Sequence, residues 1–268
     1  METQNKISAK YEKKLNLNRI LIIPAFVTIA ILLTGPVSAQ EKKKGMAGEK
    51  ERIVSNESGR GPILEIEFTK GPSHNHPLMA VWVEDTAGNY IQSLFVARSI
   101  AKGTFRYVEN RSGEWSEGEA RRPAALPYWG HQRGVKAEDG LYIPDPDNPL
   151  PDAYSGATPK GSFILETRLD EPASEVFKVL FEINQPWDWN DYWSNPKYPD
   201  DEAYRTSSQP AVIYSATVNL KDDKNEYPMK VAGRAHHSGR DGRLYQDTET
   251  LTTALEITDS IVVRVREN

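Results

Sequence analysis

Short segments in which hydrophobic and polar residues alternate recur along the chain from about residue 62. Ile63–Thr69 alternates in this way, and the apolar Pro77–Glu84 is joined to Tyr90–Val96 by the turn Asp85–Asn89. Alternation with a period of two is typical of strands with one buried face, and a turn containing Gly and Asn between two strands indicates a hairpin. Further strands are predicted at Gly161–Leu169, Val176–Ile183, Ala211–Leu220, Tyr227–Ala235 and Ile261–Arg266.

The hydrophobic pattern also restricts the fold class. No long segment has convincing helical periodicity, and the predicted strands are short and separated by turn residues. This pattern favours an all-β, antiparallel β-sandwich, which we expect to be immunoglobulin-like. Lys102–Pro159 is too long for a plain loop in a compact domain, and its aromatic residues argue against disorder. We therefore expect a sandwich with one long loop insertion.

The N-terminal stretch has the residue order of a secretory signal peptide. Several basic residues precede an apolar run from Ile20 to Leu33, and Val37-Ser38-Ala39 offers a small-residue cleavage site. This order is that of a segment removed on export, and the apolar run is short for a membrane span. We expect a cleaved signal peptide at 1–39 with no stable membrane span after cleavage, a disordered linker at 40–61, and one β-sandwich domain at 62–268.

Composition and charge restrict the classes of function that this chain can have. The chain has a formal net charge of -5, and it becomes more acidic once the basic leader is removed, which argues against nucleic acid as a partner. It contains no cysteine. An exported protein without cysteine has no disulfide or thiol chemistry, so any redox role requires a bound cofactor. We expect a secreted protein, located in the periplasm or outside the cell.

A polar turn, Asp152–Pro159, ends the long insertion just before a predicted strand. Gly156 and Ala157 leave space beside the neighbouring hydroxyl groups, and Gly156 is expected to take a positive φ that aims N–H groups at a phosphate. Ser155 is expected to brace the turn through its hydroxyl. Asp152 is expected either to cap the turn or to approach a metal ion that neutralises phosphates. These residue types suit a loop that accepts a bulky anionic group.

The same turn resembles a known attachment motif. It matches Asp-x-x-[Ser/Thr]-Gly-Ala-[Ser/Thr], on which FAD:protein FMN transferases attach FMN through its phosphate to the last hydroxyl, as in flavin-carrying quinone reductase subunits. The resemblance implies that Thr158 is the acceptor and that an FMN transferase is a partner. Pro159 cannot continue a strand ladder, so Thr158 is expected to stay outside the following strand.

Aromatic residues and cations are mixed within the insertion, at Arg121–Gly134. Such a mixture suits a flavin, because its ring stacks on aromatic side chains and its phosphate pairs with arginine. In this interpretation Trp129 shields one face of the flavin and Arg122, with Arg121 and Arg133, adjusts its potential. The alternative is a loop held against the sandwich by Trp129 and Tyr128.

A second aromatic cluster follows the strand that ends near Asn184. Trp187–Trp193 contains four large rings, which are too many for a solvated loop, so they either plug one end of the sandwich or form a platform for a flavin or a sugar. The five histidines include the pairs His74, His76 and His236, His237. Without cysteine or a recognisable zinc motif they do not predict a zinc site, and we assign no catalytic residue. A metal or haem chaperone built on these histidines is a third, less favoured alternative.

The resemblance extends beyond the acceptor motif. His76–Asp85, Pro127–Trp129, Asp152–Thr158 and Leu251–Leu255 are similar to an uncharacterised family of predicted periplasmic bacterial proteins, and the similarity covers most of the folded domain. Members tend to be encoded near FMN transferases and PepSY-type membrane reductases. This implies a flavin-carrying protein that exchanges electrons with a PepSY-type membrane reductase or another redox partner, a carrier rather than a complete enzyme. The alternative is a cofactor-free secreted binding module whose aromatic loops hold a sugar or protein ligand.

Overall fold

The computed structural model describes residues 50–109, 114–171 and 174–266. Strands dominate this part of the chain, and its helices are short. The strands are β1 (Glu51–Val54), β2 (Ile63–Lys70), β3 (Leu78–Glu84), β4 (Tyr90–Ala97), β5 (Thr104–Glu109), β6 (Trp115–Glu119), β7 (Ser155–Gly156), β8 (Phe163–Arg168), β9 (Val176–Asn184), β10 (Val212–Asn219), β11 (Glu226–Pro228), β12 (Lys230–Arg234) and β13 (Thr258–Arg266). The α-helices are α1 (Arg98–Lys102), α2 (Pro127–Arg133) and α3 (Glu202–Ser207), and the 3₁₀ turns are η1 (Asp152–Tyr154), η2 (Asn195–Lys197) and η3 (Thr253–Glu256).

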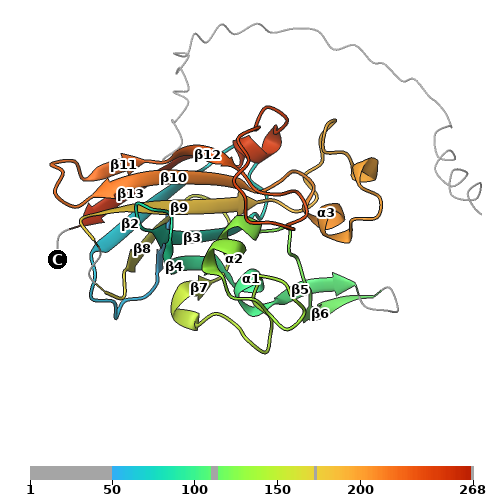
Figure 1. Ribbon diagram of the computed structural model, residues 1–268, viewed down its shortest axis with the longest axis horizontal. Coiled ribbons are helices and arrows are strands. Elements are labelled where there is room, and N and C mark those ends of the chain that lie inside the picture. Colours follow the sequence, from blue (N-terminus) through green and yellow to red (C-terminus); the bar gives the residue numbers. More distant parts are fainter. Residues whose placement is uncertain (1–49, 110–113, 172–173, 267–268) are drawn as a thin grey trace, which may run out of the picture. The chain divides into compact units, whose positions relative to one another are not determined.

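Two β-sheets form the framework of the domain (Figure 1). Among the described residues, sheet A has the strand order β1-β8-β2-β13-β11 and sheet B the order β12-β10-β9-β3-β4-β7, while β5 and β6 form a separate hairpin. Neighbouring strands are antiparallel except at one edge of each sheet, where β1 runs parallel to β8 and β7 parallel to β4. The expected all-β sandwich is confirmed. Its narrower description as immunoglobulin-like stays a prediction.

The main core lies between the two sheets. Buried and partly exposed residues alternate along strand β2, because its apolar residues face sheet B while Glu65 and Glu67 face outward. Phe68 stacks on Phe163 of its own sheet at 5.0 Å between ring centroids and on Phe181 of sheet B at 5.7 Å. Removing such apolar surface from water supplies most of the stabilisation that holds a sandwich together.

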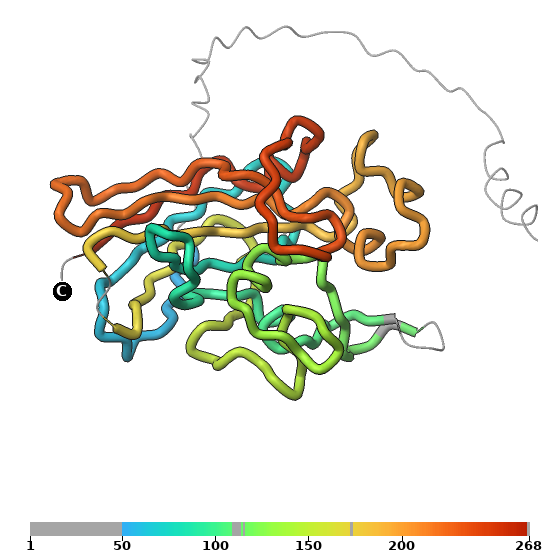
Figure 2. The backbone as a smooth tube through the Cα atoms, in the orientation of Figure 1, coloured from blue at the N-terminus to red at the C-terminus, as the bar shows by residue number. Residues whose placement is uncertain are grey.

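A second core covers the outer face of sheet B. The insertion, green in Figure 2, lies beside the strands of this sheet, and Figure 1 shows α2 over β3 and β4. Trp82, Leu180 and Ile213 point from sheet B into this layer, where they meet Leu126 and Trp129 of the insertion. Strand β3 is therefore buried on both faces along its whole length, which explains why its sequence is a continuous apolar run.

Two segments differ from the expectations. The expected disordered linker at 40–61 contains strand β1. Arg52 of this strand pairs with Glu166, and Ile53 packs against the core. The expected strand Tyr227–Ala235 is divided at Met229, with β11 in sheet A and β12 in sheet B. The expected signal peptide and the start of the linker lie outside the described residues. No helix among the described residues is long and apolar enough to cross a membrane.

Candidate functional site

The turn that carries Thr158 lies at the β7 edge of sheet B. Strand β7 pairs with β4, with Ser155 opposite Val96 and Gly156 opposite Ala97. Ala157 is exposed and Thr158 is half-buried, and β8 begins only at Phe163, so Thr158 lies outside that strand as expected. Within the part of the chain that the structure describes, no hydrogen bond engages the Thr158 hydroxyl.

Gly156 is required by close packing rather than by an unusual backbone conformation. Its φ is not positive, so the prediction of a left-handed glycine that aims N–H groups at a phosphate is wrong. A Cβ atom at this position would lie 2.6 Å from Cε2 of Phe95, well inside van der Waals contact. Glycine therefore lets the turn lie flat against β4, which leaves the following two residues at the surface.

Side-chain contacts at Asp152 and Tyr154 help to fix the turn. Lys102 Nζ lies 2.8 Å from an Asp152 carboxylate oxygen, and this contact lowers the pKa of that exposed carboxyl. The Tyr154 hydroxyl donates to Asp170 at 2.8 Å. Asp152 begins η1, but Pro151 occupies the N-cap position and no side chain of the described residues caps the turn, so the predicted capping role of Asp152 is wrong. The Ser155 hydroxyl is buried without a hydrogen-bond partner among the described residues, so the prediction that it braces the turn is wrong.

Trp129 lies inside the second core. Its side chain is fully buried, and its ring nitrogen Nε1 donates to Ser93 Oγ at 2.8 Å. Because the ring has no exposed face, it is not available to stack on a flavin, and the interpretation of Trp129 as a flavin shield is corrected. The alternative in which Trp129 and Tyr128 hold this segment against the sandwich agrees with the packing, since Tyr128 contacts Trp82 at 5.9 Å between ring centroids.

Glu182, which the sequence analysis did not single out, anchors the same helix. Its fully buried carboxylate accepts hydrogen bonds from the backbone N–H groups of Trp129, at 2.7 Å, and Tyr128, at 3.1 Å. Burial raises the pKa of Glu182 to about 8, and the two N–H groups act in the opposite direction because they favour the ionised form. A glutamate inside the apolar strand Val176–Asn184 was the available signal, because buried charges are rare unless they have hydrogen-bond partners.

The arginines expected near a flavin occupy different environments. Arg121 is held by Asp139, with Nε 2.6 Å from the carboxylate. Arg133 lies over the ring of Trp129, 5.4 Å from its centroid. Arg122 lies 4.8 Å from the centroid of Phe105 and lines a cavity whose lining includes no residue of the turn 152–158. The structure therefore does not gather the predicted cofactor-binding residues into one pocket with Thr158.

The aromatic cluster Trp187–Trp193 mostly plugs one end of the sandwich. Trp193 is buried, and Asn190 fixes the loop by accepting hydrogen bonds from the backbone N–H groups of Tyr192 and Trp193. Trp187 and Tyr192, in contrast, are 55% and 52% exposed. The structure therefore agrees with a plug for the buried rings and leaves two rings partly exposed, one of which, Tyr192, has Lys197 Nζ 3.1 Å from its ring centroid.

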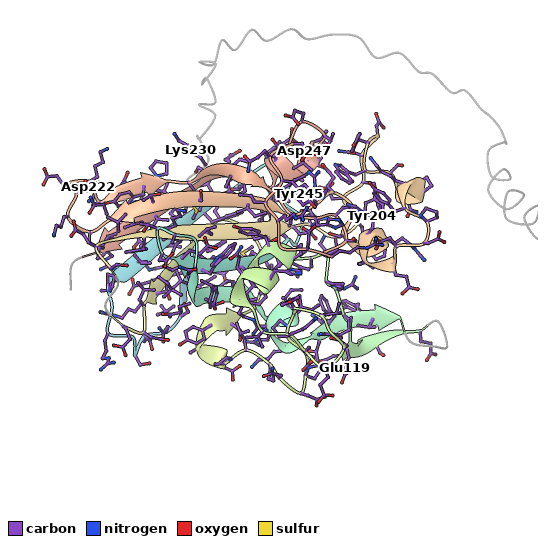
Figure 3. The ribbon with its side chains drawn as sticks, viewed as in Figure 1. Glu119, Tyr204, Asp222, Lys230, Tyr245 and Asp247 are labelled. Carbon is purple, nitrogen blue, oxygen red and sulfur yellow. The ribbon has the colours of Figure 1, made fainter. Side chains whose placement is uncertain are left out.

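Two histidines extend this cluster. His237 stacks on Tyr198 at 4.2 Å between ring centroids, and His236 stacks on His237 at 4.3 Å. Burial lowers the pKa of His237 to about 4. Figure 3 shows Tyr204 and Tyr245, which also contact these rings, toward the same end of the domain. Across the described residues, no group of three or more His, Asp or Glu side chains is placed to hold a metal ion.

Comparisons of this chain with protein-family models, with curated proteins and with solved structures give no match. Two features among the described residues are candidate places that bind or accept a group. The first is the free hydroxyl of Thr158 at the edge of sheet B, and the second is the cavity beside Arg122. They differ in chemistry, because a hydroxyl can form an ester, whereas a guanidinium can only form hydrogen bonds and ion pairs.

Proposed function

We propose that this protein is an exported electron carrier with FMN attached to Thr158 by a phosphoester bond. In the attachment step, the Thr158 oxygen forms a bond to the FMN phosphorus of FAD while the bond between the two phosphates of FAD breaks. AMP leaves, and the hydroxyl proton is released. An FMN transferase supplies this chemistry, and FAD supplies the energy of the bond that is broken. When bound, the flavin accepts and donates electrons, which no side chain of a cysteine-free protein does readily.

The free Thr158 hydroxyl is the observation that carries this proposal. A transferase needs an acceptor oxygen that it can reach and that no other group holds, and Thr158 is partly exposed with no hydrogen bond among the described residues. The two residues that precede Thr158 are small, because Gly156 packs against Phe95 and Ala157 is exposed. Neither of them obstructs access to the Thr158 hydroxyl. The rigid edge of sheet B would hold the attached group in a fixed place.

The surroundings of a flavin attached to Thr158 differ from the aromatic and arginine-rich surroundings that the sequence predicts. Trp129 is buried and Arg122 lines a separate cavity, so neither is assigned to the flavin. Within the turn, Asp152 forms an ion pair with Lys102 of α1. In this proposal the flavin lies at the surface and exchanges electrons with a PepSY-type membrane reductase or another redox partner in the periplasm or outside the cell. The residues that would direct export lie outside the described part of the chain.

The test is coexpression of the chain with an FMN transferase that is active on a known acceptor, followed by intact-mass measurement. We expect the purified protein to be yellow and to gain the mass of one FMN less one water. Thr158→Ala should abolish the gain, and Thr158→Ser should retain it because serine supplies the same nucleophilic oxygen. Thr86→Ala is a matched control, since Thr86 is also exposed in a tight turn next to alanine and glycine.

Two outcomes would refute the proposal. One is an unchanged mass for the wild-type chain in the presence of the active transferase, and the other is an added FMN that persists in Thr158→Ala. The first outcome would favour the alternative, a cofactor-free secreted binding module for a sugar or protein ligand, for which the exposed rings of Trp187 and Tyr192 are the supporting observation.

A further inference from the structure

A cavity of about 520 Å³ opens between the β5–β6 hairpin and helix α3. Its lining includes Val108 of the hairpin, Arg122 just after it, Trp187 of the aromatic loop, and Glu202, Arg205 and Thr206 of α3. Figure 1 shows α3 and the hairpin at the same end of the domain. The volume is in the range that holds a small organic molecule of a few rings.

Arg122 is the unusual residue of this cavity. Its guanidinium is half-buried, and burial lowers its pKa. Among the described residues no carboxylate pairs with it, and its Nε atom is buried without a hydrogen-bond partner. The ring of Phe105 lies 4.8 Å from the guanidinium carbon and contacts it. A partly desolvated cation without a counter-ion is costly by itself, and an anionic ligand would compensate it.

Arg205 adds a second positive charge to the cavity. It lies in the last turn of α3 and is exposed, and no carboxylate of the described chain pairs with its side chain. Arg121 also lines the cavity, but Asp139 and the carbonyl of Ile143 already engage its guanidinium. The available charges are therefore those of Arg122 and Arg205, opposed by the single carboxylate of Glu202.

Trp187 presents a flat ring to the same cavity. Its side chain is more than half exposed although the neighbouring Trp193 is buried. Its φ is 66°, a left-handed conformation that is unfavourable for a bulky residue. The next residue is fixed, because the Asp188 carbonyl accepts a hydrogen bond from the backbone N–H of Gln209 and its carboxylate accepts one from the Thr253 hydroxyl. The fold thus holds the indole at the cavity in spite of backbone strain.

We propose that this cavity binds a planar aromatic molecule that carries a carboxylate, sulfonate or phosphate group. The anionic group pairs with Arg122 and Arg205, and the aromatic ring stacks on Trp187. Arginine is suited to such groups because its planar fork donates two parallel hydrogen bonds. Glu202 limits the negative charge that the cavity tolerates, which favours ligands with one anionic group. The site is independent of the FMN proposal, since it shares no residue with the turn 152–158.

The test is isothermal titration of the Thr158→Ala protein, which carries no acceptor hydroxyl, with naphthalene-2-sulfonate. The matched ligands are naphthalene-2-sulfonamide, which has the ring without the charge, and methanesulfonate, which has the charge without the ring. We expect binding of the aromatic sulfonate and at least about tenfold weaker binding of the other two. FMN and AMP are titrated in the same way, to distinguish a nucleotide-like ligand from a simple aromatic acid.

Three variants test the assignment of residues. Arg122→Gln should weaken binding of naphthalene-2-sulfonate by about tenfold or more, since it removes a charge-assisted contact. Trp187→Gly should weaken it by about threefold to tenfold. Because glycine tolerates a positive φ, Trp187→Gly should fold at least as stably as the parent, so its lost binding cannot be ascribed to misfolding. Arg243→Gln, which removes an exposed arginine outside the cavity lining, should bind as the parent does.

The proposal is overturned if naphthalene-2-sulfonate shows no binding at millimolar concentration. It is also overturned if the neutral sulfonamide binds equally well, or if Arg122→Gln and Trp187→Gly bind with unchanged affinity. Each of these results is obtained in a protein that lacks Thr158, and so none of them bears on FMN attachment.

Discussion

Replacing Glu182 with glutamine should change how the stability of the protein depends on pH. The carboxyl group is fully buried on sheet B, and its pKa is raised to about 8 from a usual value of 4.5. Between these two values the folded protein retains a proton that the unfolded chain has released. Unfolding then releases a proton, so the free energy of unfolding falls as the pH rises from about 4.5 to about 8.

The size of this effect follows from the difference between the two pKa values. At about 1.4 kcal/mol for each pH unit, the loss of stability across this range is at most about 5 kcal/mol. The pKa of about 8 already includes the hydrogen bonds from the N–H groups of Tyr128 and Trp129, which favour the ionised form and keep the pKa from rising further. Glu182→Gln has no titrating group at this position, so its stability should change less over the same range of pH.

The assay is urea unfolding, followed by tryptophan fluorescence, at pH 5, 7 and 9. We expect Glu182→Gln to gain stability relative to the parent as the pH rises. Glu119→Gln is the matched control, because Glu119 is an exposed strand residue, labelled in Figure 3, and its variant should follow the parent at all three values. Parallel profiles for the parent and Glu182→Gln would show that the buried carboxyl is not protonated in the folded protein, and the reasoning would be wrong.

Three further predictions concern the turn and the aromatic end. Gly156→Val should destabilise the fold by about 1–3 kcal/mol through its clash with Phe95, and Phe95→Leu should restore part of the loss in thermal unfolding; an unaffected melting temperature would contradict the packing argument. Because the pKa of His237 is lowered to about 4, stability should fall as the pH drops from about 6.5 to 4, and His237→Gln should flatten this dependence in acid unfolding curves; an equally steep curve would count against a neutral, half-buried imidazole. Asn190→Ala should cost about 2 kcal/mol or more and increase proteolysis within 187–193, since it leaves two backbone N–H groups without acceptors; unchanged cleavage would refute that role.

Much of the sandwich was predictable, because each of its strands follows a simple hydrophobic pattern. Ile63–Lys70 alternates since one of its faces is exposed, and Leu78–Glu84 is uniformly apolar since both its faces are buried. The strand Glu51–Val54 was missed for a physical reason. Its Arg52 forms ion pairs with Glu166 of β8 and Glu65 of β2, and such cross-strand pairing cannot be read from a local sequence.

The candidate site was less predictable, because burial of an aromatic residue depends on what covers it. Trp129 and Trp187 both lie in stretches rich in aromatic residues, yet the first is fully buried and the second is more than half exposed. What separates them is the second core on the outer face of sheet B, which forms only when the insertion folds back. The turn at Thr158 was located from its motif, whereas the conformation of Gly156 and the isolation of the Ser155 hydroxyl depend on the contact with β4.

The passage of the chain from β11 to β12 has a mechanical consequence. Pro228 belongs to a strand of one sheet and Lys230 to a strand of the other, and the Met229 side chain lies in the core between them. This short segment therefore connects the two sheets covalently. If one sheet slid over the other, strand pairing would have to break at this point. We therefore expect the two sheets to unfold in a single cooperative step. We also expect them to resist shear better than two sheets that are connected only at their ends.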